Sequence, residues 1–332
     1  MKIVGKFPNV RLRRVRNTKW MRKLISENEL SINDLILPIF VREGKGKVET
    51  IKSMPGVNRY SVDRLSVVMK QVKKFKIPMV ALFPYTQKNK KDDNGTEALN
   101  ENNLVCKSLR FIKKNYSKIG VMCDVALDPY TSHGHDGIIN NKEIDNDKTI
   151  EILVKQALLQ ASMGCDVIAP SDMMDGRIGI IRKALDRNNF QNVSILSYAA
   201  KYASSFYGPF REAVGSKNNL KTDKKTYQMD FHNSNEAFRE VGLDIKEGAD
   251  IVMIKPGLPY LDIIRSVKDN FKIPVFAYQV SGEYSLIKNG IKNNLINENA
   301  ILESLIAFKR AGASAIVTYF ALEVARKLKK VN

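Results

Sequence analysis

Two short apolar stretches, each carrying a lysine at its end, decide the fold of this chain and the location of its chemistry. The first is Ser-Ile-Leu-Ser-Tyr-Ala-Ala-Lys at residues 194–201, and the second is Ile-Val-Met-Ile-Lys-Pro-Gly at residues 251–257. Both have the composition of a buried strand, and Lys201 and Lys255 stand where each strand gives way to a loop. A lysine amine is a nucleophile only when neutral, and burial or a neighbouring cation lowers its pKa. We therefore predict that the two lysines are covalent catalysts that converge on one pocket.

The length and composition of the chain are those of a globular protein. Its 332 residues allow one large α/β barrel or two medium domains. No apolar run is as long as a membrane span, and residues 1–20 are basic without the apolar core of a secretory signal. The three cysteines have no regular spacing, which argues against a disulfide framework or a structural zinc site. We expect a cytoplasmic protein with no membrane partner.

The formal net charge of +19 raises the question of a nucleic-acid partner. The lysines are spread through the whole chain and accompany abundant Asn and Ile, which indicates a general bias in composition. We therefore expect a solvated basic surface and no nucleic-acid partner. Some of this positive charge would still help to attract an anionic substrate.

Apolar runs and helical patterns alternate along most of the chain. The eight apolar runs of strand length are residues 35–41, 79–85, 120–127, 166–171, 194–200, 250–255, 274–280 and 314–320. The helical patterns between them are residues 61–76, 102–115, 147–163, 179–187, 235–247, 260–270 and 297–310. Gly164, Gly248 and Gly312 follow three of these patterns, as expected at helix C-termini.

This alternation predicts an α/β fold with a parallel sheet that is covered on both faces. Eight units favour a closed (β/α)8 TIM barrel over an open sheet, and no GxGxxG motif follows the first strand. We expect residues 31–332 to form a single barrel domain. Residues 1–30 lack periodicity and are expected to form an extended N-terminal arm that contacts a neighbouring subunit.

In such a barrel the chemistry gathers at the C-terminal ends of the strands. For a single serine there, simple entry into solvent would be explanation enough, but two lysines at the ends of adjacent apolar strands are harder to explain in that way. Six successive strands end in or near a polar side chain: Asp124 with Asp128, Ser171 with Asp172, Lys201, Lys255, Ser281 and Tyr319.

Two loops at this end are rich in polar residues. The loop after the third strand, residues 124–137, holds Asp124, Asp128 and Asp136 with two of the three histidines, and it suits a hard cation or a substrate ammonium group. The loop after the fifth strand holds Arg211 and Lys224, which suit the carboxylate clamp of a mobile lid. From residue types alone, an ordinary turn-rich loop and an ordinary solvated loop remain open alternatives.

Several long motifs, in order, resemble the porphobilinogen synthase (5-aminolevulinate dehydratase) family over nearly the whole chain. The motifs are Tyr-Thr-Ser-His-Gly-His-Asp-Gly at 130–137, Ile-Ala-Pro-Ser-Asp-Met-Met-Asp-Gly at 168–176, residues 201–211, Met-Ile-Lys-Pro-Gly at 253–257 and Tyr-Gln-Val-Ser-Gly-Glu at 278–283. The resemblance implies a TIM-barrel lyase that condenses two 5-aminolevulinate molecules into porphobilinogen, in the synthesis of haem and other tetrapyrroles.

The resemblance also implies roles for individual residues. Lys255 would form the Schiff base with the substrate on the propionate side, and Lys201 would do so on the acetate side. The other residues that match substrate-binding positions are Ser281 and Tyr319 for the first carboxylate, Arg211, Lys224 and Gln228 for the second, Asp124 and Ser171 near the amino end, and Tyr207 in the lid.

Zinc-dependent members of this family carry three cysteines where this chain has Ala126, Asp128 and Asp136. The chain thus resembles the aspartate-rich branch, which implies no catalytic zinc. Carboxylates favour Mg²⁺ or a monovalent cation, so Asp128 and Asp136 are candidates for an active-site cation. Glu240 matches the position of an allosteric Mg²⁺ site, and the family likeness implies a homo-octamer whose N-terminal arms wrap neighbouring subunits.

Two other interpretations compete with this one, an enzyme of another kind and a protein without activity. A Schiff-base aldolase on the same barrel would also use a lysine at a strand end, but it has no evident need for Lys201 or for the Asp-rich loop. A catalytically inactive homologue is not favoured either, because both lysines are intact.

Overall fold

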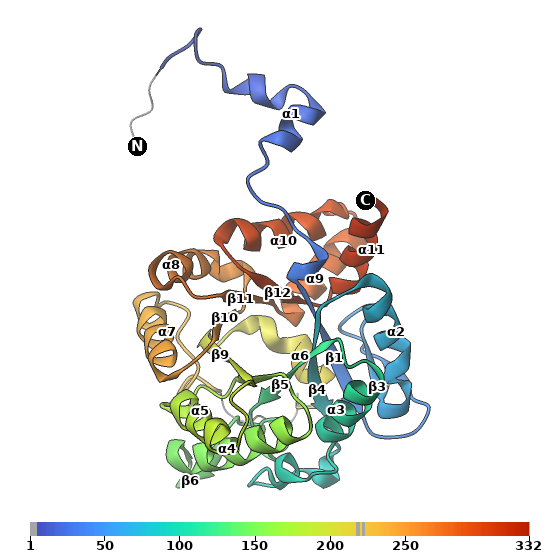
Figure 1. Ribbon diagram of the computed structural model, residues 1–332, viewed down its shortest axis with the longest axis vertical. Coiled ribbons are helices and arrows are strands. Elements are labelled where there is room, and N and C mark those ends of the chain that lie inside the picture. The colour runs from blue at the N-terminus through green and yellow to red at the C-terminus, as the bar shows by residue number, and fades with distance from the viewer. Residues whose placement is uncertain (1–4, 217–219, 221–222, 332) are drawn as a thin grey trace.

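The computed structural model describes residues 5–216, 220 and 223–331, and within them eight parallel strands close into a barrel (Figure 1). The first and last strands pair with each other, with Leu35 opposite Ile316. Along the chain the barrel strands are β1 (Leu35–Arg42), β4 (Met79–Tyr85), β5 (Gly120–Val125), β8 (Val167–Pro170), β9 (Ser194–Lys201), β10 (Ile251–Lys255), β11 (Val275–Gln279) and β12 (Ala315–Thr318). Each lies within one residue of a predicted run or inside it, and the prediction of a (β/α)8 barrel is confirmed.

The barrel strands are buried along almost their whole length because residues face either the barrel interior or the surrounding helices. Every residue of β8 and β12 is buried, as are seven of the eight residues of β9. A strand covered on both faces has no solvent side, so its sequence is continuously apolar instead of alternating. This is why the short apolar runs identified the strands correctly.

Helices cover the outside of the barrel, and the seven predicted helical patterns are all confirmed. They are α2 (Leu65–Phe75), α3 (Leu104–Asn115), α4 (Asn146–Ser162), α5 (Arg177–Arg187), α7 (Asn235–Glu247), α8 (Leu261–Phe271) and α10 (Asn299–Ala311). Gly248 and Gly312 end two of them in the left-handed region, with φ of 109° and 106°, where a residue with a Cβ would be strained.

Three helices near the C-terminal ends of the strands were not predicted. They are α6 (Gly208–Ala213), α9 (Ser281–Lys292) and α11 (Ala321–Val331). Helices α9 and α11 begin two and three residues after the strands that precede them, and α6 lies within the loop after β9. The sequence in these places was interpreted as loop. Two antiparallel strand pairs lie in the loops between barrel strands. They are β2 (Val48–Thr50) with β3 (Asn58–Ser61), and β6 (Ile138–Asn140) with β7 (Glu143–Asp145).

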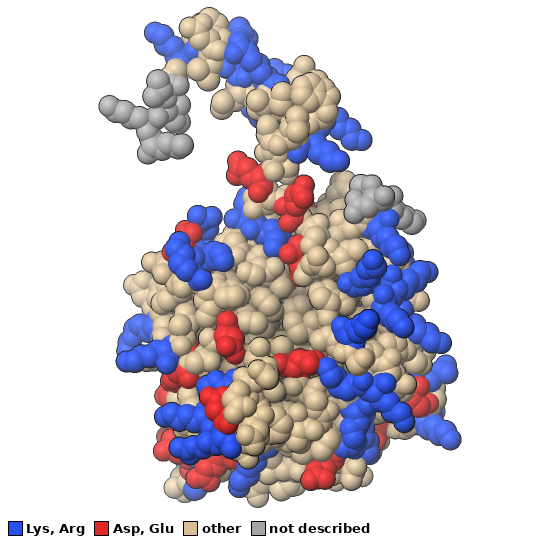
Figure 2. All heavy atoms as spheres, viewed as in Figure 1, with Lys and Arg blue, Asp and Glu red and all other residues tan. Residues whose placement is uncertain are grey.

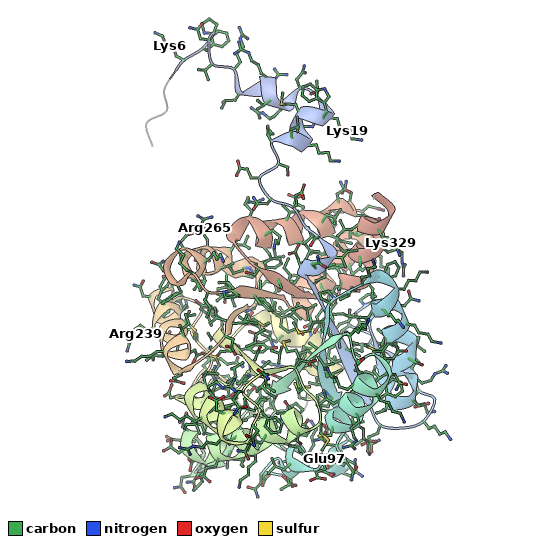
Figure 3. The ribbon with its side chains drawn as sticks, viewed as in Figure 1. Lys6, Lys19, Glu97, Arg239, Arg265 and Lys329 are labelled. Atoms are coloured by element: carbon green, nitrogen blue, oxygen red, sulfur yellow. The ribbon has the colours of Figure 1, made fainter. Side chains whose placement is uncertain are left out.

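The described part of the N-terminal arm, residues 5–30, extends away from the barrel (Figure 1). It contains a 3-10 turn at Leu12–Arg16 and the short helix α1 (Lys19–Leu24), neither of which buries a residue. Trp20 is 61% exposed and Leu24 is 74% exposed. Lys6 and Lys19 point outward from the arm (Figure 3). Residues 1–4 of the predicted arm and 217–219 and 221–222 of the predicted lid lie outside the described residues, as does the C-terminal residue 332.

Basic side chains are scattered over the surface instead of forming one patch on the face shown in Figure 2, where acidic side chains lie among them. Arg239, Arg265 and Lys329 belong to three different outer helices (Figure 3). Among the described residues, none of the helices has the length and apolar character needed to cross a membrane.

Gly257, in the turn after β10, is packed closely against its neighbours, and this packing can be tested. A Cβ added to Gly257 would overlap the buried ring of Phe308 and lie 3.0 Å from the carbonyl oxygen of Tyr278. Because a ring in a packed core cannot move aside freely, we expect Gly257→Ala to destabilise the fold by about 1–3 kcal/mol. Thermal unfolding would measure this as a lowered midpoint.

Gly179→Ala is the matched control, because Gly179 lies in α5 and its added Cβ would make only an ordinary contact, 3.4 Å from Glu247. Alanine favours a helix over glycine by roughly 1 kcal/mol, so this control should be neutral or slightly stabilising. An unchanged midpoint in Gly257→Ala would contradict the packing account.

Candidate active site

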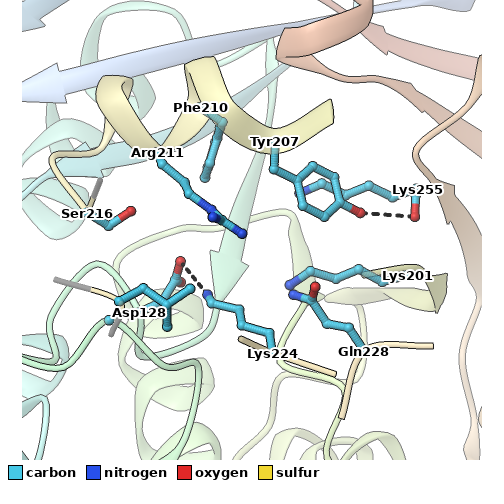
Figure 4. Close-up of a pocket in the computed structure, with 11 residues that line it drawn as sticks. Asp128, Lys201, Tyr207, Phe210, Arg211, Ser216, Lys224, Gln228 and Lys255 are labelled. Carbon is cyan, nitrogen blue, oxygen red and sulfur yellow. Dashed lines mark hydrogen bonds and ion pairs between the residues drawn. The ribbon is translucent and has the colours of Figure 1, made fainter. Parts of the chain in front are cut away.

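The two lysines lie side by side at the C-terminal end of the barrel. Strands β9 and β10 pair in parallel with Lys255 directly opposite Lys201. Both residues are buried, at 5% exposure for Lys201 and 7% for Lys255, and both line one cavity (Figure 4). The predicted convergence of the lysines is confirmed, since adjacent parallel strands bring their carboxyl ends to the same rim.

Lys255 stands in an aromatic box. Its Nζ lies 4.8 Å from the ring centroid of Tyr278, 5.0 Å from that of Tyr198 and 5.2 Å from that of Phe210. Aromatic faces attract the protonated amine. Burial and repulsion from Lys201 both disfavour the protonated form. Together burial and Lys201 lower the pKa of Lys255 to about 7, so much of this amine is neutral near neutral pH.

Lys201 has a different environment from Lys255, because acceptors surround its ammonium group. Its Nζ donates to the carbonyl oxygen of Ser171 and, at 3.2 Å, to Oδ1 of Asp136. Although burial opposes it, the charges of Lys201 and Lys224 hold the pKa of Asp136 well below its usual range. The site therefore contains one lysine held by a carboxylate and one lysine beside aromatic rings.

The Asp-rich loop and the lid meet over the same cavity. Lys224 Nζ lies 3.3 Å from Asp128 Oδ2 and 2.7 Å from Asp136 Oδ2. Although burial opposes it, these carboxylates raise the pKa of Lys224 and keep its amine charged. Arg211 and Gln228 line the cavity beside Lys224 (Figure 4). The residues predicted for the second carboxylate are thus brought together with both lysines.

Of three further predicted site residues, Tyr207 lines this cavity, whereas Ser281 and Tyr319 are not among the residues that line it. The Tyr207 hydroxyl donates to the backbone carbonyls of Tyr202 and Lys255, at 2.8 and 3.2 Å, and its ring lines the cavity. Ser281 Oγ accepts from the backbone N–H of Phe210 at 2.9 Å, which ties α9 to α6. Tyr319 shares a hydrogen bond of 3.0 Å with Tyr278, and it lines a second cavity near β1 and α11.

Asp124 is half-buried near the end of β5, where the charges of both lysines act on its carboxyl group. Burial raises its pKa to about 6, although the nearby charge of Lys255 opposes this shift. Ser171 donates a hydrogen bond to it, and its Oδ1 has no hydrogen-bond partner among the described residues. A carboxyl with such a pKa changes its protonation near neutral pH, as a general acid or base must.

Two residues that organise the site were missed in the sequence. The buried carboxylate of Glu283 accepts from the backbone N–H of Val280 and, at 2.5 Å, from that of Leu258, so it joins the loops that follow β11 and β10. Its place three residues into α9, after a strand, was a signal for a capping glutamate. Tyr227 donates to Asp136 Oδ2 at 3.0 Å, and no sequence pattern indicated that contact.

The residues suggested for metal ions lie in two places. Asp128 and Asp136 face the ammonium groups of Lys224 and Lys201, so the chain itself supplies the positive charge beside them. Glu240 lies in a separate groove with Glu236 and Asp175. In the described ranges no three or more His, Cys, Asp or Glu side chains are grouped closely enough to hold a metal ion by themselves.

Comparisons with known proteins agree with this architecture and this site. The family model described as delta-aminolevulinic acid dehydratase matches residues 9–327. A delta-aminolevulinic acid dehydratase of Bradyrhizobium diazoefficiens is 56% identical over 96% of this chain and 91% of its own length. Another, of Methanothermus sociabilis, is 50% identical over 97% of this chain and 100% of its own length.

A crystal structure of delta-aminolevulinic acid dehydratase from Toxoplasma gondii, in complex with the reaction product porphobilinogen, superposes with a TM-score of 0.95. It is 42% identical in sequence, and the match covers 97% of this chain and 92% of that one. The chain therefore belongs to the delta-aminolevulinic acid dehydratase (porphobilinogen synthase) family, and its activity is the hydro-lyase reaction that joins two 5-aminolevulinate molecules into porphobilinogen in tetrapyrrole biosynthesis.

Proposed function

We propose that Lys255 and Lys201 each form a Schiff base with one of the two 5-aminolevulinate molecules. The observation that carries this proposal is their direct pairing across β9 and β10 in one buried cavity. An imine on lysine activates the ketone carbon of the substrate and acidifies its neighbour. Holding both substrates on adjacent strands also turns a bimolecular condensation into a reaction within one site.

Different groups would bind the two substrates. Lys255 would hold the first, with Ser281 and Tyr319 for its carboxylate. Lys201 would hold the second, whose carboxylate would meet Arg211, Lys224 and Gln228 in the same cavity. The arrangement of charges supports this division, because a guanidinium and an ammonium group together suit a carboxylate.

Asp124 and Ser171 would act near the amino end of the substrates. Asp124 has a pKa raised by burial to about 6 and lies among the lysines, which suits proton transfer during imine formation and loss of water. Tyr207 would close the cavity from the 3-10 turn that precedes α6, where its hydroxyl donates to the backbone carbonyl of Lys255. These roles do not require a metal ion.

We place the chain in the aspartate-rich branch, which lacks catalytic zinc. Ala126, Asp128 and Asp136 offer no thiolate, and zinc sites in proteins depend mainly on Cys and His. A monovalent cation near Asp128 and Asp136 would compete with Lys224 and Lys201. The allosteric ion would be Mg²⁺ at Glu240. Glu236 and Asp175 line the same groove, but within the described residues these carboxylates are not close enough together to hold the ion without further ligands.

The assembly that we propose is a homo-octamer in which the arm, residues 1–30, packs on a neighbouring subunit. The exposed apolar side chains of the arm, such as Trp20 and Leu24, support this proposal because they bury nothing within one chain. We also propose a cytoplasmic location, which the free, buried thiols of Cys106, Cys123 and Cys165 fit.

The Schiff-base proposal predicts a particular pH dependence. Because burial and Lys201 lower the pKa of Lys255 to about 7, its neutral amine accumulates as the pH rises through that value. Levulinate is a 4-oxo acid without the amine, so it can form the imine but cannot complete the condensation. After brief exposure to levulinate and borohydride reduction, mass spectrometry should find adduct on Lys255 with a half-maximal rate near pH 7.

Lys255→Met should abolish this adduct, whereas Lys183→Met, at an exposed lysine of α5, should leave it unchanged. A half-maximal rate near pH 10, the range of an ordinary lysine, would contradict the account of the lowered pKa. Absence of any adduct on Lys255 would contradict its Schiff-base role.

The metal proposal is tested on metal-stripped protein. Porphobilinogen formation should rise when Mg²⁺ is added and should not respond to Zn²⁺. Mg²⁺ should also raise the midpoint of thermal unfolding, because a ligand that binds only the folded state stabilises it. Both responses to Mg²⁺ should disappear in Glu240→Ala.

Glu303→Ala makes the same change at an exposed position of α10, and this control should keep both responses. If Mg²⁺ stimulates Glu240→Ala as much as it stimulates the unaltered protein, Glu240 is not a ligand of the ion. Activity restored by Zn²⁺ alone would overturn the assignment to the aspartate-rich branch.

A further inference from the structure

Lys91 is a half-buried lysine whose ammonium group has no hydrogen-bond partner among the described residues. It follows the 3-10 turn at Lys88–Lys90, in the loop after β4. Its Nζ is withdrawn from solvent and makes no hydrogen bond within the part of the chain that the structure describes. A buried ammonium group without an acceptor costs folding free energy. The position therefore has to be explained by something other than stability.

The charged groups that act on Lys91 belong to the second-carboxylate site. Burial lowers the pKa of Lys91, Asp128 opposes that shift, and Lys224 reinforces it. The next residue, Asp92, pairs with Thr131 of the Asp-rich loop, and its backbone N–H donates to the carbonyl oxygen of Tyr130 at 3.3 Å, so the Lys91 segment lies against the loop that holds Asp128. The Nζ of Lys224 is the one that lies 3.3 Å from Asp128 Oδ2. Asp128 has two lysines near it and is paired with one of them.

Substrate binding would change this balance. In the proposed function, Lys224 turns toward the carboxylate of the second substrate. Asp136 would keep Lys201 and the hydroxyl of Tyr227 as partners, at 3.2 and 3.0 Å. Asp128 would lose the ion-pair partner that it has among the described residues and would face a new anion. Two carboxylates in a buried site repel each other strongly unless a cation stands between or behind them.

We propose that Lys91 is a positioning residue that takes Asp128 as its ion-pair partner when Lys224 moves to the substrate carboxylate. The exchange keeps Asp128 compensated both before and after binding, and it frees Lys224 at little electrostatic cost. This inference rests on the proposed clamp role of Lys224. It assigns Lys91 to binding of the second substrate, and Lys91 does not touch the reacting atoms.

The proposal predicts that Lys91 affects substrate binding and not chemistry or folding. In Lys91→Met the KM for 5-aminolevulinate should rise about tenfold, while kcat changes by less than about threefold. Lys91→Arg should recover most of the loss, because arginine keeps the charge. The midpoint of thermal unfolding of Lys91→Met should be unchanged or higher. Methionine removes a charge that has no partner and keeps most of the volume of the lysine side chain.

Lys88→Met is the matched control, because Lys88 is exposed in the same turn and should behave like the unaltered protein. Trapping of levulinate on Lys255 should be equal in all of these variants, because the first site is not involved. An unchanged KM in Lys91→Met, or a lowered unfolding midpoint with a proportionate loss of Lys255 trapping, would overturn the proposal.

Lys224→Met separates this inference from the proposal on which it rests. A raised KM in Lys224→Met together with an unchanged KM in Lys91→Met would overturn the role of Lys91 alone. An unchanged KM in Lys224→Met would overturn the clamp, and the role of Lys91 with it. Raised KM values in both, with equal Lys255 trapping, would support the exchange of partners.

Discussion

The burial of two lysines side by side is the constraint on which the rest of this site depends. The register of β9 and β10 brings Lys255 opposite Lys201 within a closed barrel, where water cannot screen one ammonium group from the other. The two lysines have different surroundings. Lys201 receives a carbonyl and a carboxylate, whereas Lys255 receives aromatic rings and has its pKa lowered to about 7. In these surroundings much of the Lys255 amine is neutral near neutral pH.

The carboxylates of the Asp-rich loop are the ion-pair partners of two lysines in the site. Asp136 links Lys201 to Lys224, and Asp128 adds a second contact to Lys224. The loop therefore supplies carboxylate partners directly to Lys201 and Lys224. When an anionic substrate enters, its carboxylate would compete with Asp128 and Asp136 for Lys224. In the proposed exchange, Lys91, in the loop after β4, becomes the ion-pair partner of Asp128 when Lys224 binds the substrate.

The sequence predicted the barrel and the pair of lysines at its rim because both depend on short stretches of chain. A strand buried on both faces is continuously apolar, and a lysine at its end stands out against that background, as Lys255 does in residues 251–257. The contacts of Glu283, Tyr227 and Lys91 could not be found in this way. Glu283 reaches a backbone N–H 25 residues away in sequence, and Tyr227 reaches Asp136 across 91 residues. Such contacts depend on how loops from different strands pack together.

The most direct test of the lysine pair is the pH dependence of levulinate trapping on Lys255 in Lys201→Met. Methionine keeps most of the volume of the side chain and removes its charge, so burial persists while the repulsion between the lysines disappears. The half-maximal rate should therefore move upward from about pH 7, toward the range of an ordinary lysine. A midpoint that stays at its original pH, or falls, would contradict the claim that Lys201 helps to keep Lys255 neutral.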